Sequence, residues 1–176
     1  MPFILGLIAV IGAAYFWMNR AKNAANVASD VVDMAESALG AARRFGFRRK
    51  ADRHPVDSID DAKLAIGGLS TAFLELSGLP TTEEKHALVV GLQSSLDLSH
   101  ADAEEMTILG HWFVNACNGA QPAVSRLAKR VNALSGPEGL TQSMEVIQRI
   151  AEASGGVLSP AQGEALDEIK RVFRIR

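Results

Sequence analysis

The chain has 176 residues, of which 48% are hydrophobic, a fraction typical of a folded protein and not of a disordered one. Its net charge of -2 divides unevenly along the chain. Residues 1–57 are net basic, whereas residues 58–176 carry ten Lys and Arg against fifteen Asp and Glu. This division argues against nucleic-acid binding by the second part, and the single cysteine, Cys117, excludes an internal disulfide and fits a reducing compartment.

The N-terminal segment 1–19 has no charged side chain and is apolar from Phe3 to Met18. As a helix this run covers roughly 25 Å, slightly under the roughly 30 Å hydrocarbon core of a bilayer. No basic residue precedes it, which favours an uncleaved transmembrane anchor over a signal peptide. The basic residues that follow predict a single span in the inner membrane, with the N-terminus outside and the C-terminal domain in the cytoplasm. The side chains expected at the membrane interface are Tyr15, Trp17, Arg20 and Lys22.

Residues 20–45 are rich in alanine and contain no proline, which predicts a juxtamembrane helix that continues from the span. Apolar residues from Ala24 to Phe45 recur in steps of three and four, the spacing of a coiled coil. The spacing would allow a homo-oligomer formed through residues 24–45. The simpler interpretation is a lone helix that lies along the membrane or along its own domain, because many of the spaced residues are alanines, which bury little area.

Residues 46–57 read as a helix stop followed by a basic linker. If the preceding helix lies flat, the linker meets anionic lipid headgroups; if it stands upright, the linker is held roughly 35–40 Å away, which is several Debye lengths. The simpler alternative to lipid contact is a linker that contacts only solvent. Binding of the basic residues to RNA is a weaker alternative. The residues expected to contact anionic lipid are Arg43, Arg44, Arg48, Arg49, Lys50 and Arg53.

Residues 58–176 show helical apolar spacing and no period-two alternation, which predicts an all-α domain. Glycine and proline pairs divide it, and Thr81 or Thr82, Ser99 and Ser159 are placed to cap helices. The expected fold is a compact orthogonal bundle of about six helices. These helices are expected over about 58–76, 81–96, 99–117, 121–134, 140–153 and 159–173.

The domain's histidines do not form a metal-binding pattern. No two of His86, His100 and His111 stand at the i, i+4 spacing that places ligands on one helical face, and no cysteine pair assists them. The sequence therefore predicts no zinc site and no cofactor.

Other residues that carry chemistry have simpler structural explanations. Cys117 has no basic neighbour in sequence that would lower its pKa, so it is expected to be a small core residue. Gly67 and Gly68 lack the residues of a phosphate-binding loop and indicate close helix packing. Trp112 beside Phe113 is expected to fill the core. No catalytic constellation is evident, so the chain is expected not to be an enzyme; an enzyme with an unrecognised site is the alternative.

Two stretches, Leu76 to Glu84 and Ser154 to Gln162, share one layout: a helix end, a glycine, an apolar residue, a Ser or Thr cap, and the next helix. This layout resembles the TerB-like family, which includes tellurite-resistance TerB and the membrane-anchored N-terminal part of the DjlA co-chaperones. Its members repeat an Asp-Gly-x-apolar-Ser-x-x-Glu motif between the helix pairs of an all-α bundle. The resemblance covers roughly residues 58–176.

The resemblance implies metal binding at the repeated acidic positions, a membrane-linked stress response and assembly with partners. Ser77 and Gly155 stand where the family has aspartate, Gln162 stands where it has glutamate, and Glu84 alone keeps its carboxylate. The expected function is therefore a membrane-tethered, non-enzymatic interaction module that recruits a protein partner. A metal-responsive protein of the tellurite-resistance type is the alternative that the resemblance supplies.

Overall fold

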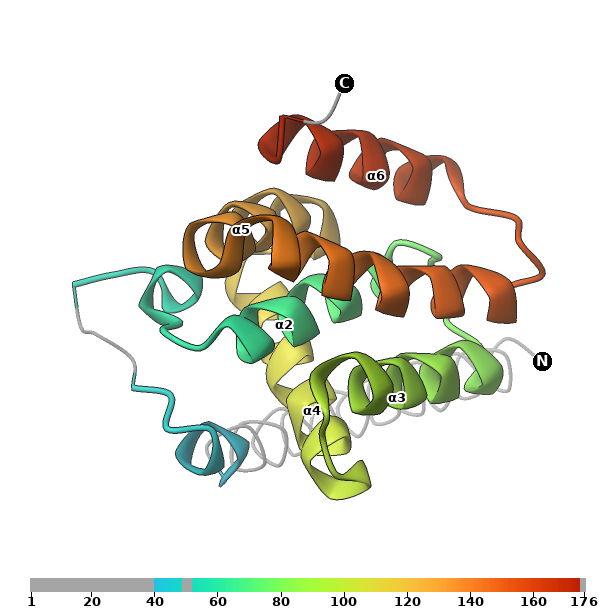
Figure 1. Cartoon of the computed structure of the whole chain (residues 1–176). Coiled ribbons are helices and arrows are strands. Elements are labelled where there is room, and N and C mark those ends of the chain that lie inside the picture. The colour runs from blue at the N-terminus through green and yellow to red at the C-terminus, as the bar shows by residue number, and fades with distance from the viewer. Residues whose placement is uncertain (1–39, 49–51, 175–176) are drawn as a thin grey trace, which may run out of the picture. The chain divides into compact units, whose positions relative to one another are not determined.

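The computed structural model describes residues 40–48 and 52–174, and every regular element within these ranges is helical (Figure 1). This confirms the all-α prediction for the described part of the chain. The expected span 1–19 and most of the expected helix 20–45 lie outside it, and no helix inside it has the length and apolar character to cross a bilayer. The elements are η1 (Pro55–Ser58), α2 (Ala62–Glu75), α3 (Thr82–Leu96), α4 (His100–Ala116), α5 (Ala120–Ala153) and α6 (Pro160–Val172).

Hydroxyl caps start three of the helices where the sequence predicts them. At α3, Thr81 Oγ1 accepts the Glu84 N–H at 3.2 Å, and Glu84 Oε2 accepts the Thr81 N–H at 2.7 Å. Ser159 and Gln162 make the same reciprocal pair at α6, at 3.1 and 3.0 Å, and Ser99 caps α4. Each cap satisfies backbone N–H groups that have no partner within the helix.

The helices expected over 121–134 and 140–153 are two arms of α5, joined at a kink. Gly136 has φ 55° and ψ -134°, outside the helical region, and Pro137 follows it without an N–H to donate. Only glycine adopts this backbone conformation without strain. The predicted break is therefore present, but as a kink and not as a loop.

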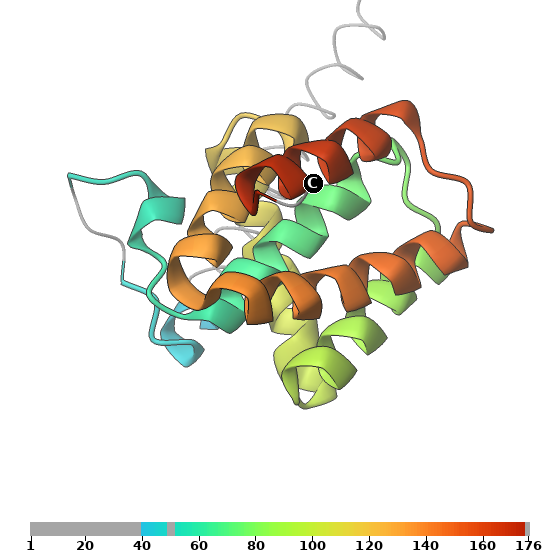
Figure 2. The ribbon, with the colours of Figure 1, turned by 45° about the horizontal axis from the view of Figure 1, so that its top comes forward.

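The central element of the domain is α2, which lies between α5 and the α3–α4 pair in Figures 1 and 2. Its residues from Leu64 to Leu74 form an unbroken buried run. Helical apolar spacing, as in the sequence, indicates one buried face; instead, neighbours cover α2 all round. A helix that is apolar on every face requires such an enclosed position.

Glycines at the helix contacts allow α2 and its neighbours to approach each other closely, as the pair Gly67-Gly68 in the sequence predicts. A Cβ on Gly67 would lie 2.4 Å from Met106 Cγ and Sδ of α4, and a Cβ on Gly110 of α4 would lie 2.3 Å from Thr71 Oγ1 of α2. Both distances are far inside van der Waals contact. The α2–α4 interface therefore depends on the absence of two side chains.

Residues before the expected domain boundary at 57/58 also pack on the bundle, among them Ala41 and Phe45. The Phe47 ring meets the rings of Trp112 and Phe113 edge-on, with centroids 5.9 and 5.4 Å away. Val56 is fully buried in η1, within the segment expected to be a linker. The first long helix begins at Ala62, not at about 58, because η1 and an extended turn come before its cap.

Candidate functional site

Two loops, 76–81 between α2 and α3 and 154–159 between α5 and α6, lie side by side; we call them the loop pair. Ser159 Oγ donates to the Leu76 carbonyl at 2.9 Å, which ties one loop to the other across 83 positions. In each loop a glycine with positive φ, Gly78 or Gly156, precedes an apolar residue and a capping-box residue. The two stretches that look alike in sequence are therefore also alike in local structure.

The loop pair borders a hollow of about 680 Å³. Ser77, Glu84 and Gln162, three of the four positions carried over from the family motif, line this hollow, whereas Gly155 does not. Glu84 is buried and occupied as the α3 cap, and Ser77 Oγ donates to the Leu74 carbonyl at 2.9 Å. Residues 40–48 and 52–174 contain no group of three His, Cys, Asp or Glu side chains placed to hold a metal ion.

The side chain of Gln162 donates one hydrogen bond that a glutamate side chain could not donate. Its side chain is 1% exposed; Oε1 accepts the Ser159 N–H, and Nε2 donates to the Phe73 carbonyl of α2 at 3.4 Å. A carboxylate keeps the acceptor but loses the donor, which would leave two oxygens facing each other in a buried place. Glutamine at this position therefore has a physical reason in this fold.

Gln162→Glu is accordingly expected to lower the free energy of unfolding by about 1–3 kcal/mol. The matched control is Glu84→Gln, the reverse change at the equivalent cap, which keeps its acceptor oxygen and should cost less than about 1 kcal/mol. Urea unfolding followed by far-ultraviolet circular dichroism measures both. Equal losses in the two variants would contradict the role assigned to the Gln162 amide.

The apolar residues at the loop tips point away from the core. Leu79 is 94% exposed and Val157 is 77% exposed, and they are the large hydrophobic residues exposed on the described part of the chain. They occupy equivalent positions, each two residues before a capping residue. Sequence reasoning aligned these loops but did not identify their tips as a surface.

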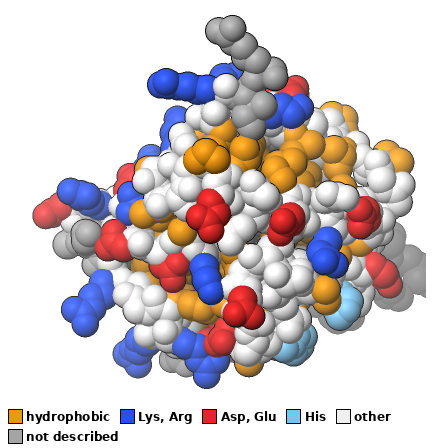
Figure 3. All heavy atoms as spheres, in the orientation of Figure 1, with side chains coloured by type: hydrophobic (Ala, Val, Ile, Leu, Met, Phe, Trp, Pro, Cys, Tyr) orange, Lys and Arg blue, Asp and Glu red, His pale blue; other side chains and the backbone are white. Residues whose placement is uncertain are grey.

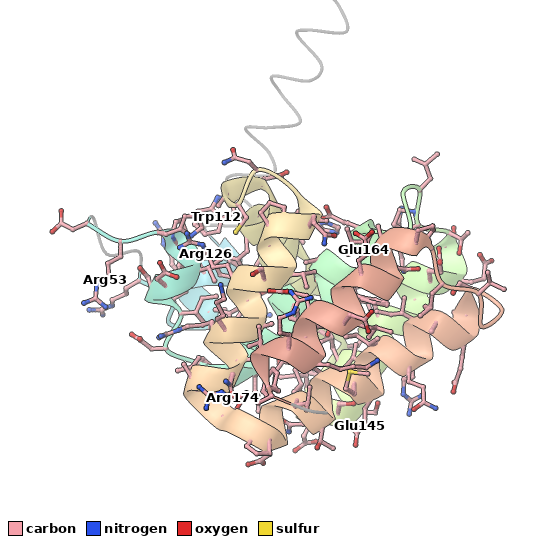
Figure 4. The ribbon with its side chains drawn as sticks, turned by 90° about the horizontal axis from the view of Figure 1, so that it is seen from above. Arg53, Trp112, Arg126, Glu145, Glu164 and Arg174 are labelled. Atoms are coloured by element: carbon pink, nitrogen blue, oxygen red, sulfur yellow. The ribbon has the colours of Figure 1, made fainter. Side chains whose placement is uncertain are left out.

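A second hollow, of about 910 Å³, lies between residues 53–57, the end of α4 and the first arm of α5. Four basic side chains line it, Arg53, Arg126, Lys129 and Arg130, against one acidic side chain, Asp57; we call it the basic hollow. Figure 4 shows Arg53 and Arg126 toward the same edge of the domain. Figure 3 shows Lys and Arg side chains gathered mainly toward the left edge of its view.

His54 and Cys117 also line the basic hollow, but they are not arranged as a nucleophile and its base. His54 Nδ1 accepts the Val56 N–H at 3.3 Å, so Nε2 carries the proton and donates to the Ala116 carbonyl at 3.1 Å. Burial raises the pKa of the Cys117 thiol; Arg126 acts to lower this pKa and Asp57 to raise it. The histidine is engaged by backbone groups and the thiol is kept protonated, which disfavours thiolate chemistry.

The basic residues expected to contact lipid lie in different surroundings. Arg44 pairs with Glu105 of α4 at 2.8 Å and with Asp102 at 3.5 Å, so its charge is already engaged. Arg43 and Arg48 are exposed, and Arg53 reaches the basic hollow. The other expected membrane contacts lie outside the described residues: Arg49 and Lys50, and the interface residues Tyr15, Trp17, Arg20 and Lys22.

The histidines lie on separate elements. His86 is exposed on α3, and His100 at the start of α4 pairs with Glu104 at 3.4 Å. His111 Nδ1 lies 2.5 Å from Glu75 Oε1, a contact between α4 and α2 that sequence spacing could not indicate. Sequence reasoning also missed the α5 members of the basic hollow, although their i, i+3, i+4 spacing is readable as one helical face.

Comparisons with known proteins identify no relative. No known protein family matches the sequence, no curated protein matches it, and no solved structure matches its fold.

Proposed function

We propose that this chain is a membrane-tethered, non-enzymatic helical interaction module. Residues 1–19 anchor it in the inner membrane by a single span, and the helical domain recruits a protein partner on the cytoplasmic side. The observation that carries the proposal is the exposure of Leu79 and Val157 at equivalent positions of the loop pair. A partner that covers these exposed apolar side chains removes them from water, which contributes favourably to the free energy of binding.

The surroundings of the loop pair define the chemistry of the partner. Glu83 is exposed beside the two apolar tips and lines the same hollow as Glu84. Residues 58–174 carry fifteen Asp and Glu against nine Lys and Arg, and none of these Lys and Arg residues lines the hollow at the loop pair. The expected partner segment presents apolar residues to Leu79 and Val157 and has Lys or Arg on its flanks.

The engaged state of the candidate catalytic groups supports a non-enzymatic role. His54 has both ring nitrogens bonded to backbone groups, and burial raises the pKa of Cys117. The resemblance to the TerB-like family adds a context, membrane-associated stress response, and agrees with the paired capping boxes of the loops. The proposal assigns those loops to partner binding.

The first step of the test concerns anchoring and orientation. The full chain is expected to sediment with membranes, and a reporter fused after Arg176 should be active in the cytoplasm. Recovery in the soluble fraction would contradict the anchor, and reporter activity on the outer side would reverse the orientation.

The second step concerns the loop pair. The full chain, solubilised from membranes, should retain a specific partner that the double variant Leu79→Asp, Val157→Asp loses by about tenfold or more. The matched control is Ala101→Asp with Gln121→Asp, which adds the same charge at exposed positions that do not line the hollow at the loop pair. Equal retention by the two double variants, or no partner with the unchanged protein, would refute the assigned surface.

A further inference from the structure

We infer that the basic hollow is a binding site for a phosphate-type anion. Of the ten Lys and Arg residues between 52 and 174, four line this one hollow, whereas only one of the seventeen Asp and Glu residues does. A basic concavity in an acidic domain does not follow from composition. It shares no lining residue with the hollow at the loop pair, so the inference does not depend on the proposed partner.

Two of the arginines are held in place by other groups. Arg126 Nη1 lies 2.6 Å from Asp57 Oδ2, and Arg130 Nε donates to the Ile59 carbonyl at 2.5 Å. Arg130 is also 3.2 Å from Asp60. These contacts orient the guanidinium groups before any ligand arrives, while each guanidinium has further N–H donors to offer.

The remaining two cations carry the unbalanced charge. Arg53 and Lys129 are exposed, and within the described residues neither pairs with an acidic side chain. Arg126, Lys129 and Arg130 stand at i, i+3 and i+4 on one helix, where like charges repel one another. An anion in the hollow would relieve this repulsion, so the site favours a ligand with more than one charged oxygen.

The polar and small side chains of the lining limit the class of ligand. Asn118 adds a neutral amide group, whereas the Ser125 hydroxyl already donates to Glu168 Oε1 at 3.0 Å; Ala116 and Ala133 provide short apolar walls. Within the described part of the chain, the lining contains no Phe, Tyr or Trp ring, and its single imidazole, His54, is part-buried and bonded to two backbone groups, which disfavours base stacking and therefore a nucleotide or RNA. The volume has room for a phosphate ester as well as for free phosphate. A lipid headgroup and a soluble phosphate share this chemistry.

The test uses the full chain in neutral detergent micelles, titrated with inorganic phosphate and with glycerol 3-phosphate at constant ionic strength set by chloride. Calorimetry should show saturable binding with a dissociation constant on the order of 1 mM or lower. The double variant Arg53→Gln, Lys129→Gln removes the two cations that have no acidic partner and leaves the arginines bonded to Asp57 and Ile59. It should weaken binding by at least about tenfold.

The matched control, Lys63→Gln with Lys85→Gln, removes the same charge from exposed positions outside the hollow and should change the affinity by less than about twofold. No saturable binding of either probe by the unchanged chain, or equal weakening in both double variants, would overturn the site.

A second arm distinguishes the two sources of the phosphate group. Titrations are repeated in nanodiscs of phosphatidylcholine alone and in nanodiscs that also contain phosphatidylglycerol. If a lipid headgroup is the ligand, phosphatidylglycerol should occupy the hollow and weaken glycerol 3-phosphate binding relative to phosphatidylcholine alone. An unchanged affinity would support the site and assign it to a soluble phosphate ester.

Discussion

A fragment that begins at Asp57 is expected to be less stable than one that begins at Ala38 by about 2–4 kcal/mol. The shorter fragment loses Val56, which is fully buried, and Phe47, whose ring lies against Trp112 and Phe113. It also loses the ion pairs of Arg44 with α4. The cost of ordering the segment offsets part of these contacts, which is why the expected difference is smaller than their sum.

Urea unfolding of the two fragments measures this difference. In the fragment from Ala38, Phe47→Ala should reproduce part of the loss, because it removes the ring contacts and leaves Val56 in place. The control variant Arg43→Ala changes an exposed residue of the same segment and should shift stability by no more than about 0.5 kcal/mol. Equal unfolding midpoints for the two fragments would show that residues 38–56 add nothing to the fold.

The second large effect is expected at the α2–α4 interface. Gly67→Ala should destabilise the domain by about 1–3 kcal/mol, because the new Cβ would overlap Met106 Cγ and Sδ. Met106→Ala alone should cost about 2–5 kcal/mol, because it leaves a cavity beside α2. In the double variant the added methyl occupies part of that cavity. Its loss should therefore be smaller than the two single losses together, by at least about 1 kcal/mol.

Gly163→Ala is the control for the helical preference of alanine, because a Cβ at Gly163 of α6 has no heavy atom within 4 Å. This change should stabilise the domain by about 0.5–1 kcal/mol. Additive losses in the Gly67 and Met106 double variant would mean that the close approach of α4 to α2 does not explain the glycine.

The helices and their caps could be predicted from sequence because their signals are local. Thr81 with Glu84, and Ser159 with Gln162, each lie three residues apart, so one short window contains both partners of a capping box. The likeness of the two loops was readable for the same reason. What that likeness could not show was contact between the loops, which depends on a hydrogen bond from Ser159 to Leu76.

The basic hollow and the docking of residues 40–48 could not be predicted, because their members are far apart in the chain. His54 bonds to Ala116 across 62 positions, and Arg126 pairs with Asp57 across 69. Arg44 was counted among the residues that could contact lipid because nothing in the sequence links it to Glu105. Enclosure of α2 was also missed, since apolar spacing reports one buried face and not how many neighbours cover a helix.

The enclosed position of α2 also has a consequence for synthesis of the chain. The helix ends at Glu75, whereas the first arm of α5, which covers part of it, ends near residue 135. At about 5–20 residues per second, a ribosome needs roughly 3–12 s to add the residues between them. For that interval α2 exists without the first arm of α5. The order of elements along the chain thus delays full burial of α2 until long after the helix itself has been made.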